Sequence, residues 1–232
     1  MNIKDMHYDF KKKVNKIDSQ KYRNLRIPEI DWVLNEAAEL FVKMIAEPRL
    51  RTNLGFETSQ RSIDDIKNIV VTDEPINVTN NIVSLPTDYW YFAKGKVIME
   101  KGDCKGVKGK LDVRQHDDDF EISPFDNSSF EWREVNGVFN KDGIKLYTEN
   151  FTVTQVLLSY IRKLTYMHNA EDFNPAGYNL PSGTTLVGSF DCELSEHTHK
   201  EIVDIAVLIT TGELESQGYQ IKQSKLKMNG LD

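Results

Sequence analysis

The residues best equipped for chemistry lie at positions 192–201, which read CELSEHTHKE. This stretch holds a cysteine, two histidines and three glutamates, and all of these side chains can ligate a metal ion. Zinc hydrolases of the H-E-x-x-H type place two histidines four residues apart on one helical face, with the glutamate as base. His197 and His199 are only two residues apart, so on a helix their side chains point about 200° from each other. They could share an ion only on a strand, where alternate residues face the same side.

The residues after the histidines favour the start of a helix over a metal site. Thr198 and Glu201 have the spacing of a capping box, in which the threonine oxygen accepts the N3 amide and the glutamate reaches back to the cap. Ser195 is a second possible cap one turn earlier. We therefore predict a helix start with no metal and no cofactor. A metal-dependent hydrolase that uses His197 and His199 is the alternative.

A run of aromatic residues at positions 89–92, YWYF, could stack on nucleic-acid bases or on sugars. On a strand, these four side chains divide equally between the two faces, which a core and a subunit contact would also explain. A nucleic-acid-binding or glycan-binding module is therefore a further alternative.

Other catalytic patterns are absent from the sequence. There is no G-x-x-x-x-G-K-[ST] phosphate loop and no G-x-S-x-G nucleophile motif. Cys104 and Cys192 lack the spacing of a metal knuckle and do not indicate a disulfide framework. From the residues alone, we predict an interaction or assembly protein and not an enzyme.

Composition and charge narrow the class of protein further. The chain has 232 residues, 39% of them hydrophobic, which suffices for a core shared by helical and β parts. No apolar run reaches the length of about 20 residues that a membrane helix needs, and the start lacks an apolar signal region. We expect a soluble protein made in a cytoplasm, with no membrane partner. The net charge of −7 argues against a broad nucleic-acid-binding surface, although residues 1–27 are basic.

Apolar spacing predicts helices towards both ends of the chain and strands between them. The helices are predicted for residues 5–20, 28–45 and 60–69, and from Thr198 onwards. The strands are predicted for residues 89–100, 107–115, 130–139, 144–148 and 152–166. Asp142-Gly143 predicts a hairpin, because glycine tolerates the positive φ that such a turn requires. Residues 167–191 are predicted to form a long ordered loop or a pair of short strands.

This order of elements indicates an α+β fold in which helices flank an inserted, mostly antiparallel β domain, because no β-α-β alternation is present. We divide the chain into an N-terminal helical segment (1–74), the β domain (75–191), a C-terminal helix that packs on the N-terminal helices (192–216) and a polar tail (217–232).

Five segments together resemble the head-to-tail connector proteins, also called ring or adaptor proteins, of crAss-like gut bacteriophages. The segments are LPTDYWYFAKGKVIMEKG, RQHDDDFEISPFDNSSFEWREVNGVF, LSYIRKLTYMHNAEDF, YNLPSG and CELSEHTHKEIVDIAVLITTGELES. The resemblance covers roughly residues 20–218. The layout is also similar to the adaptor proteins of short-tailed phages, in which helices flank an inserted β domain.

The resemblance implies a structural role in the virion. About a dozen copies of such a protein form a homo-oligomeric ring beneath the portal at the capsid vertex. The ring extends the channel, helps to retain packaged DNA and provides a docking surface for tail proteins. The DNA passes through the lumen without sequence-specific binding, and an acidic protein is compatible with this, since a negative lumen repels phosphate.

The resemblance also implies where partners dock. In such families the ends of the chain typically reach towards the portal or neighbouring rings. We therefore expect partner docking on the tail, at Lys222, Lys225 and Lys227.

Overall fold

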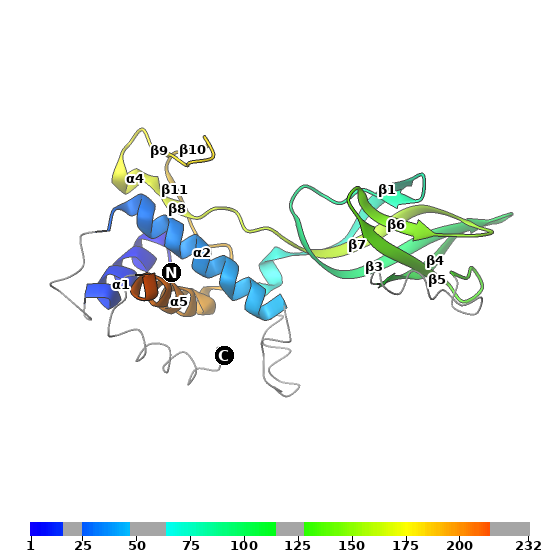
Figure 1. The fold of residues 1–232 in the computed structure, drawn as a ribbon, viewed down its shortest axis with the longest axis horizontal. Coiled ribbons are helices and arrows are strands. Elements are labelled where there is room, and N and C mark those ends of the chain that lie inside the picture. The colour runs from blue at the N-terminus through cyan, green and yellow to red at the C-terminus, as the bar shows by residue number, and fades with distance from the viewer. Residues whose placement is uncertain (16–24, 47–63, 115–127, 214–232) are drawn as a thin grey trace, which may run out of the picture. The chain divides into compact units, whose positions relative to one another are not determined.

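The computed structural model describes residues 1–15, 25–46, 64–114 and 128–213. It consists of two compact units (Figure 1), one formed by Met1–Asn68 with Leu164–Asp232 and the other by Ile69–Lys163. We call the first the helical unit and the second the barrel unit. The predicted α+β class is confirmed, with N-terminal helices, a C-terminal helix and a mostly antiparallel sheet.

Three helices form most of the helical unit: α1 (Ile3–Asn15), α2 (Ile27–Ala46) and α5 (His199–Glu213). α5 packs against both α1 and α2, so segments from the two ends of the sequence share one core. Apolar residues recur at three- and four-residue steps, and their side chains are buried where the helices meet. They include Met6, Phe10, Val14, Ile30, Leu34, Phe41, Ile202, Val203 and Ala206.

The predicted helices agree with these elements apart from their ends. α1 begins two residues earlier than predicted and is described as far as Asn15, so residues 16–20 of the prediction lie outside the described residues. The short helix predicted over 60–69 is described from residue 64, as one α-helical turn followed by a 3-10 helix, Lys67–Ile69.

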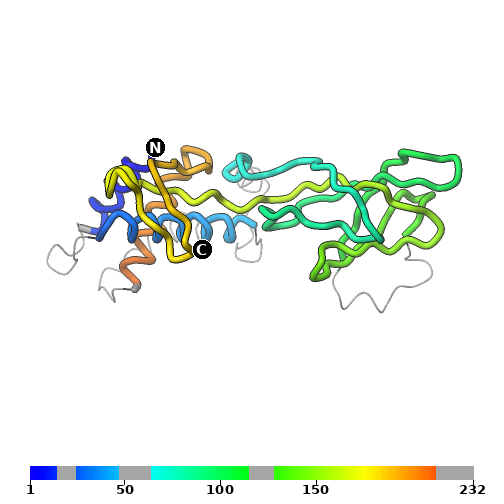
Figure 2. Tube along the Cα trace, turned by 90° about the horizontal axis from the view of Figure 1, so that it is seen from above, coloured from blue at the N-terminus to red at the C-terminus, as the bar shows by residue number. Residues whose placement is uncertain are grey.

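Residues 164–191 belong to the helical unit, where they form short elements beside α2 (Figure 2). These elements are β8 (His168–Asn169), α4 (Ala170–Phe173), β9 (Tyr178–Asn179), β10 (Thr185–Leu186) and β11 (Ser189–Phe190). β8 pairs with β11 and β9 pairs with β10, both antiparallel. The predicted alternatives were one loop or one pair of strands, whereas the structure has two pairs and a helical turn.

In the described part of the barrel unit, the strands close into a barrel in the order β1-β2-β6-β5-β4-β3-β7. Their bounds are β1 Val70–Thr79, β2 Ile82–Val83, β3 Tyr89–Lys101, β4 Cys104–Arg114, β5 Glu134–Asn140, β6 Gly143–Tyr147 and β7 Thr152–Arg162. All neighbours are antiparallel except β4 and β5, which are parallel. A parallel pair requires a long connection, and residues 115–133 supply it. The barrel encloses an apolar core that includes Val97, Met99, Leu111, Val135, Ile144, Leu146, Val156 and Leu158.

The sequence did not predict β1, and the β domain therefore has different bounds from those expected. β1 reads VVTDEPINVT, whose acidic pair and proline are unfavourable in a strand. The ladder with β7 is irregular between Val71 and Glu74, and Asp73 there has a φ of 53°. The barrel unit thus spans Ile69–Lys163, whereas the sequence interpretation placed the β domain at 75–191.

The predicted hairpin at Asp142-Gly143 is confirmed, with one difference in detail. β5 and β6 pair antiparallel, and Asn140 lies opposite Gly143 across the turn. Gly143 is the first residue of β6, and its φ of 135° is accessible only to glycine. A Cβ atom at this position would clash with the carbonyl oxygen of Val83 in β2. The glycine therefore serves both the turn and the close approach of β2.

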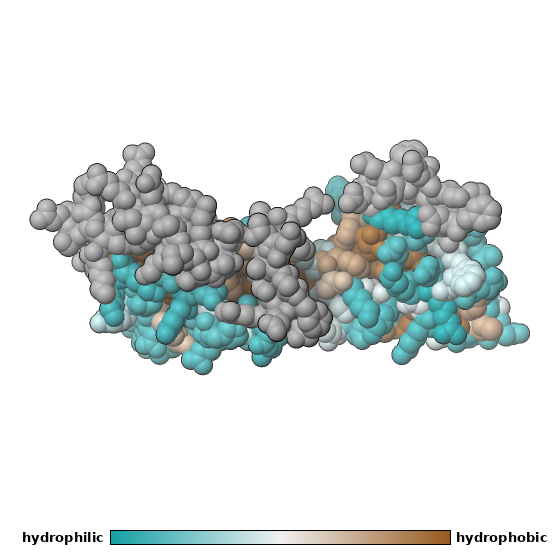
Figure 3. All heavy atoms as spheres, turned by 90° about the horizontal axis from the view of Figure 1, so that it is seen from below, coloured by the Kyte–Doolittle hydropathy of each residue, from teal (hydrophilic) through white to brown (hydrophobic). Residues whose placement is uncertain are grey.

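Several large hydrophobic side chains among the described residues are exposed, namely Tyr8, Trp32, Leu40, Trp132, Phe173, Val187 and Phe190. In the view of Figure 3, hydrophilic residues cover most of the described surface, and hydrophobic residues gather on one part of the barrel unit. None of the helices among the described residues is long and apolar enough to cross a membrane.

Candidate functional site

The structure separates the two histidines that the sequence placed in the candidate metal site. Nε2 of His197 lies 2.6 Å from Oδ1 of Asp65. The ring of His199 contacts two backbone carbonyl oxygens instead, with Nδ1 2.9 Å from Met1 and Nε2 3.0 Å from Leu194. Among the residues that the structure describes, no group of three or more His, Cys, Asp or Glu side chains is placed to hold a metal ion.

The ring of His199 links the start of the chain to the start of α5. The ring is buried, and its two nitrogens lie within hydrogen-bonding distance of backbone carbonyl oxygens from two separate segments. The N-terminal ammonium of Met1 also contacts Oε1 of Glu196 at 2.9 Å, which lowers the pKa of that carboxyl. These contacts assign the histidine pair to packing of the helical unit.

The predicted helix start is confirmed, but its hydrogen bonds differ from those of a capping box. A 3-10 turn, Glu196–Thr198, precedes α5. The hydroxyl of Thr198 donates to the carbonyl oxygen of Ser195 at 2.8 Å, and the hydroxyl of Ser195 donates to the carbonyl oxygen of Asp64 at 3.0 Å. Both hydroxyls therefore fix the turn before the helix.

The two cysteines have different surroundings. Burial raises the pKa of the Cys192 thiol to about 11, so the thiolate is scarce at neutral pH. Cys104 is exposed at the start of β4. Neither pairs in a disulfide.

The aromatic run 89–92 divides into two pairs, but not by strict alternation. The ladder between β3 and β7 shifts register between Tyr89 and Tyr91 and again after Phe92. As a result, Tyr89 and Phe92 both pack against the barrel core, 6.3 and 6.1 Å from the ring of Phe139. Trp90 and Tyr91 instead stack on each other, with ring centroids 5.1 Å apart. The four aromatic side chains are thus divided into two pairs, as expected, but the pairs are not those of strict alternation.

A buried carboxylate, which the sequence reasoning missed, organises the helical unit. Asp31 of α2 is fully buried and accepts hydrogen bonds from three other segments. Nε2 of His7 in α1 donates at 2.7 Å, the hydroxyl of Tyr178 in β9 donates at 2.7 Å, and the backbone N–H of Asn169 in β8 lies 3.1 Å from Oδ2. We call these four residues the Asp31 cluster. A carboxylate with several donors is the arrangement that makes a buried charge tolerable.

Asn35, one helical turn after Asp31, fixes the same segment to α2. Its side-chain oxygen accepts from the backbone N–H of Met167 at 2.9 Å, and its amide donates to the carbonyl oxygen of Met167 at 2.7 Å. Together Asp31 and Asn35 hold residues 166–178 against α2.

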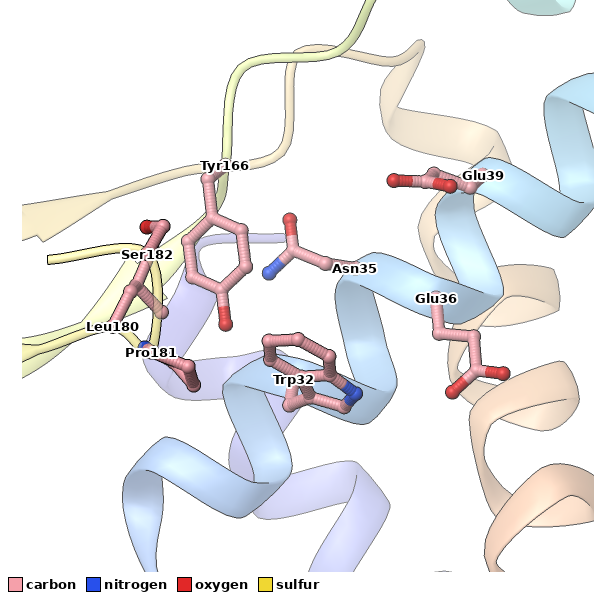
Figure 4. A pocket seen from close by; sticks show the side chains of 8 residues that line it. All are labelled: Trp32, Asn35, Glu36, Glu39, Tyr166, Leu180, Pro181 and Ser182. Carbon is pink, nitrogen blue, oxygen red and sulfur yellow. The ribbon is translucent and has the colours of Figure 1, made fainter. Parts of the chain in front are cut away.

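This arrangement forms a groove along α2 (Figure 4). Two adjoining cavities, of about 470 and 410 Å³, share Trp32, Leu180 and Pro181 in their linings. The remaining described side chains that line them are Leu25, Pro28, Glu29, Val33, Asn35, Glu36, Glu39, Tyr166, Tyr178, Asn179, Ser182 and Thr210. We call this feature the α2 groove. Trp32 lies at its centre, and 53% of this residue is exposed.

The tyrosines beside the groove stay protonated. Burial, with a smaller contribution from Asp31, raises the pKa of Tyr166 to about 12. Burial and the hydrogen bond to Asp31 raise the pKa of Tyr178 further. The buried hydroxyl of Tyr166 has no well-formed hydrogen bond among the described residues, and it points towards Trp32 in Figure 4.

The only sequence signal for this site was a pair of polar residues, Asp31 and Asn35, beside the apolar stripe of α2. The predicted docking residues Lys222, Lys225 and Lys227 lie outside the described residues.

Comparison with known proteins adds no assignment. No protein-family model matches the chain, and no curated protein matches it significantly.

Proposed function

We propose that this chain is a structural virion protein: a subunit of a ring in the head-to-tail connector of a crAss-like bacteriophage. The ring lies below the portal, extends the DNA channel and docks tail proteins. The chain is made in the cytoplasm of the bacterial host and becomes part of the virion.

The observation that carries the proposal is the layout of the two units. The helical unit combines Met1–Asn68 with Leu164–Asp232, and the barrel unit is inserted between them. Adaptor-like proteins of short-tailed phages have a similar layout, and five segments of this sequence resemble those of connector proteins from crAss-like phages. An inserted unit on a helical body can supply separate surfaces for neighbouring subunits and for the next protein in the tail.

The charge of the chain is compatible with this role. A net charge of −7 disfavours tight, non-specific binding to the passing duplex, because each bound phosphate requires a cationic partner. The proposed partners are other copies of the chain, the portal, neighbouring connector and tail proteins, and DNA that slides through the lumen.

The direct test is quantitative mass spectrometry of purified particles of the phage that encodes the chain. We expect about a dozen copies per particle relative to the major capsid protein, as the resemblance to ring-forming connector proteins implies. Absence of the chain from purified particles would overturn the proposal.

A truncated chain tests the docking residues. Deletion of residues 217–232, which removes Lys222, Lys225 and Lys227, should leave a folded chain that does not join the connector. Folding is checked by circular dichroism and incorporation by mass spectrometry of particles. Normal incorporation of the truncated chain would refute docking through the tail.

A further inference from the structure

The α2 groove has the chemistry of a site for a basic, partly apolar peptide segment. Glu29, Glu36 and Glu39 of α2 are exposed and line it, and its described lining contains no lysine or arginine. Glu39 also contacts Nζ of Lys43 at 3.7 Å. The groove therefore concentrates negative charge along one helix.

The floor and walls of the groove are aromatic and apolar. Trp32, Leu180 and Pro181 line both cavities. A lysine ammonium over the face of an exposed indole gains a cation–π attraction, and nearby carboxylates strengthen it. Apolar side chains next to that lysine would cover Leu180, Pro181 and Val33.

The chain itself contains a segment of this chemistry. Residues 217–231 carry Lys222, Lys225 and Lys227 and no acidic residue. Apolar residues alternate with these lysines, at Tyr219, Ile221, Leu226 and Met228.

The segment also follows, within a few residues of sequence, a residue that lines the groove. Thr210 of α5 lines the smaller cavity, and α5 ends three residues later at Glu213. A connection this short gives a local concentration in the millimolar range, which favours binding within one chain over binding between chains.

We propose that the α2 groove binds residues 217–231 of the same chain. In the free subunit this contact covers Trp32 and neutralises the three carboxylates of the groove. Docking of the segment on another protein then exposes the groove, so that the two events compete.

The test uses Trp32 as a reporter in the full chain. Trp90 and Trp132 are replaced by Phe, which leaves Trp32 as the single tryptophan, and its fluorescence is quenched with acrylamide. We expect a several-fold higher quenching constant after deletion of residues 217–232, and again after the triple change Lys222→Glu, Lys225→Glu and Lys227→Glu. A synthetic peptide of residues 217–231 should restore protection to the truncated chain.

The matched control reverses three exposed lysines of the barrel unit, Lys105, Lys108 and Lys141, to glutamate. It makes the same change in net charge and should leave the quenching of Trp32 as it was. The triple variant in the tail keeps the full chain length, so it gives an answer even if the truncated chain fails to fold.

Two results would overturn the proposal. Equal quenching of Trp32 in the full, truncated and charge-reversed chains would show that the segment does not cover the groove. Protection that grows with protein concentration, together with cross-links between labelled and unlabelled chains, would make a second copy the occupant. The competition with docking rests on the proposed function, but the contact between the segment and the groove does not. The quenching measurement involves no phage particles, so its failure can be distinguished from failure of the virion role.

Discussion

Different interactions stabilise the helical unit and the barrel unit internally. In the helical unit, α1, α2, β8 and β9 come from distant parts of the sequence and meet at one buried carboxylate, Asp31. The barrel unit is continuous in sequence, and ladders of backbone hydrogen bonds close it around an apolar core. Its buried tyrosine, Tyr160, donates to Glu74 and Asp88, which are only half-buried.

This difference predicts where single substitutions act. Loss of the one buried carboxylate in the Asp31 cluster leaves several hydrogen-bond donors without an acceptor inside the helical unit. Buried donors without an acceptor lower the free energy of unfolding. The barrel distributes its stability over many apolar contacts and ladder bonds, so it responds most to changes of shape. We therefore expect the stability of the helical unit to depend most on substitutions that remove buried polar groups. We expect the stability of the barrel unit to depend most on substitutions that change its backbone geometry.

The largest effect is expected for Asp31→Ala. It leaves Nε2 of His7, the hydroxyl of Tyr178 and the amide of Asn169 without their acceptor. Removing one partner of a buried charged network costs about 3–5 kcal/mol of the free energy of unfolding. Hydrogen exchange followed by mass spectrometry should show faster exchange throughout the helical unit and unchanged protection in the barrel.

Asp204→Ala is the matched control for this change. Asp204 lies in α5 and contacts Nζ of Lys13 at 3.1 Å, with much of its side chain exposed. An exposed ion pair contributes about 1 kcal/mol or less, so exchange should change little. If Asp31→Ala and Asp204→Ala had similar effects, Asp31 would not be the organising residue of the unit.

A change of backbone geometry should have an intermediate effect, in the barrel. Gly143→Ala forces a left-handed conformation that costs about 1–3 kcal/mol. The new methyl group would also clash with the carbonyl oxygen of Val83, and the shift of backbone that this forces adds to the cost. We expect a lower midpoint of urea unfolding for the barrel unit, measured by hydrogen exchange as above.

Gly102→Ala provides the comparison within the same unit. Gly102 also has a positive φ, 57°, but nothing lies within 4 Å of the position its Cβ would take. It should cost about 1–2 kcal/mol, from backbone conformation alone. Equal losses for the two variants would show that the approach of β2 to Gly143 contributes nothing.

The same contrast explains what the sequence could and could not predict. Helical stripes and the strand pattern are local, so α1, α2, α5 and the strands from β3 to β7 were found from spacing. β1 was missed because Asp73, Glu74 and Pro75 hide a strand whose stability comes from pairing with β7. The two histidines were correctly assigned to a helix start, since a spacing of two is itself local information.

The α2 groove could not be predicted in this way. Trp32 and Pro181 are far apart in the sequence, and only the bonds of Asp31 and Asn35 bring their segments together. A polar residue beside an apolar stripe shows that a partner is needed, but not which distant segment supplies it. The same limit applies to Tyr89 and Phe92, whose shared face depends on irregular pairing with β7.

The hydroxyl groups of the two units can be compared by a matched pair of changes, Tyr178→Phe and Tyr160→Phe. Each removes one hydroxyl that donates to carboxylate at 2.7 Å. Asp31 is fully buried and cannot regain water, so Tyr178→Phe should cost about 1.5–3 kcal/mol, the range for hydrogen bonds to charged groups. Water can reach the half-buried Glu74 and Asp88, so Tyr160→Phe should cost about 1 kcal/mol or less.

Alkaline pH provides an independent measurement of the same pair. Burial raises the pKa of both tyrosines, and their hydrogen bonds to carboxylates raise it further. Unfolded tyrosine loses its proton near pH 10, while the folded state keeps it, so the stability of the native chain falls as the pH rises above about 10. Each Phe variant lacks one of these groups, and its stability should fall less steeply over that range. Urea unfolding at pH 8 and pH 11 measures both the stability lost in each variant and its dependence on pH. A larger loss for Tyr160→Phe than for Tyr178→Phe at pH 8 would reverse the proposed division between the two units.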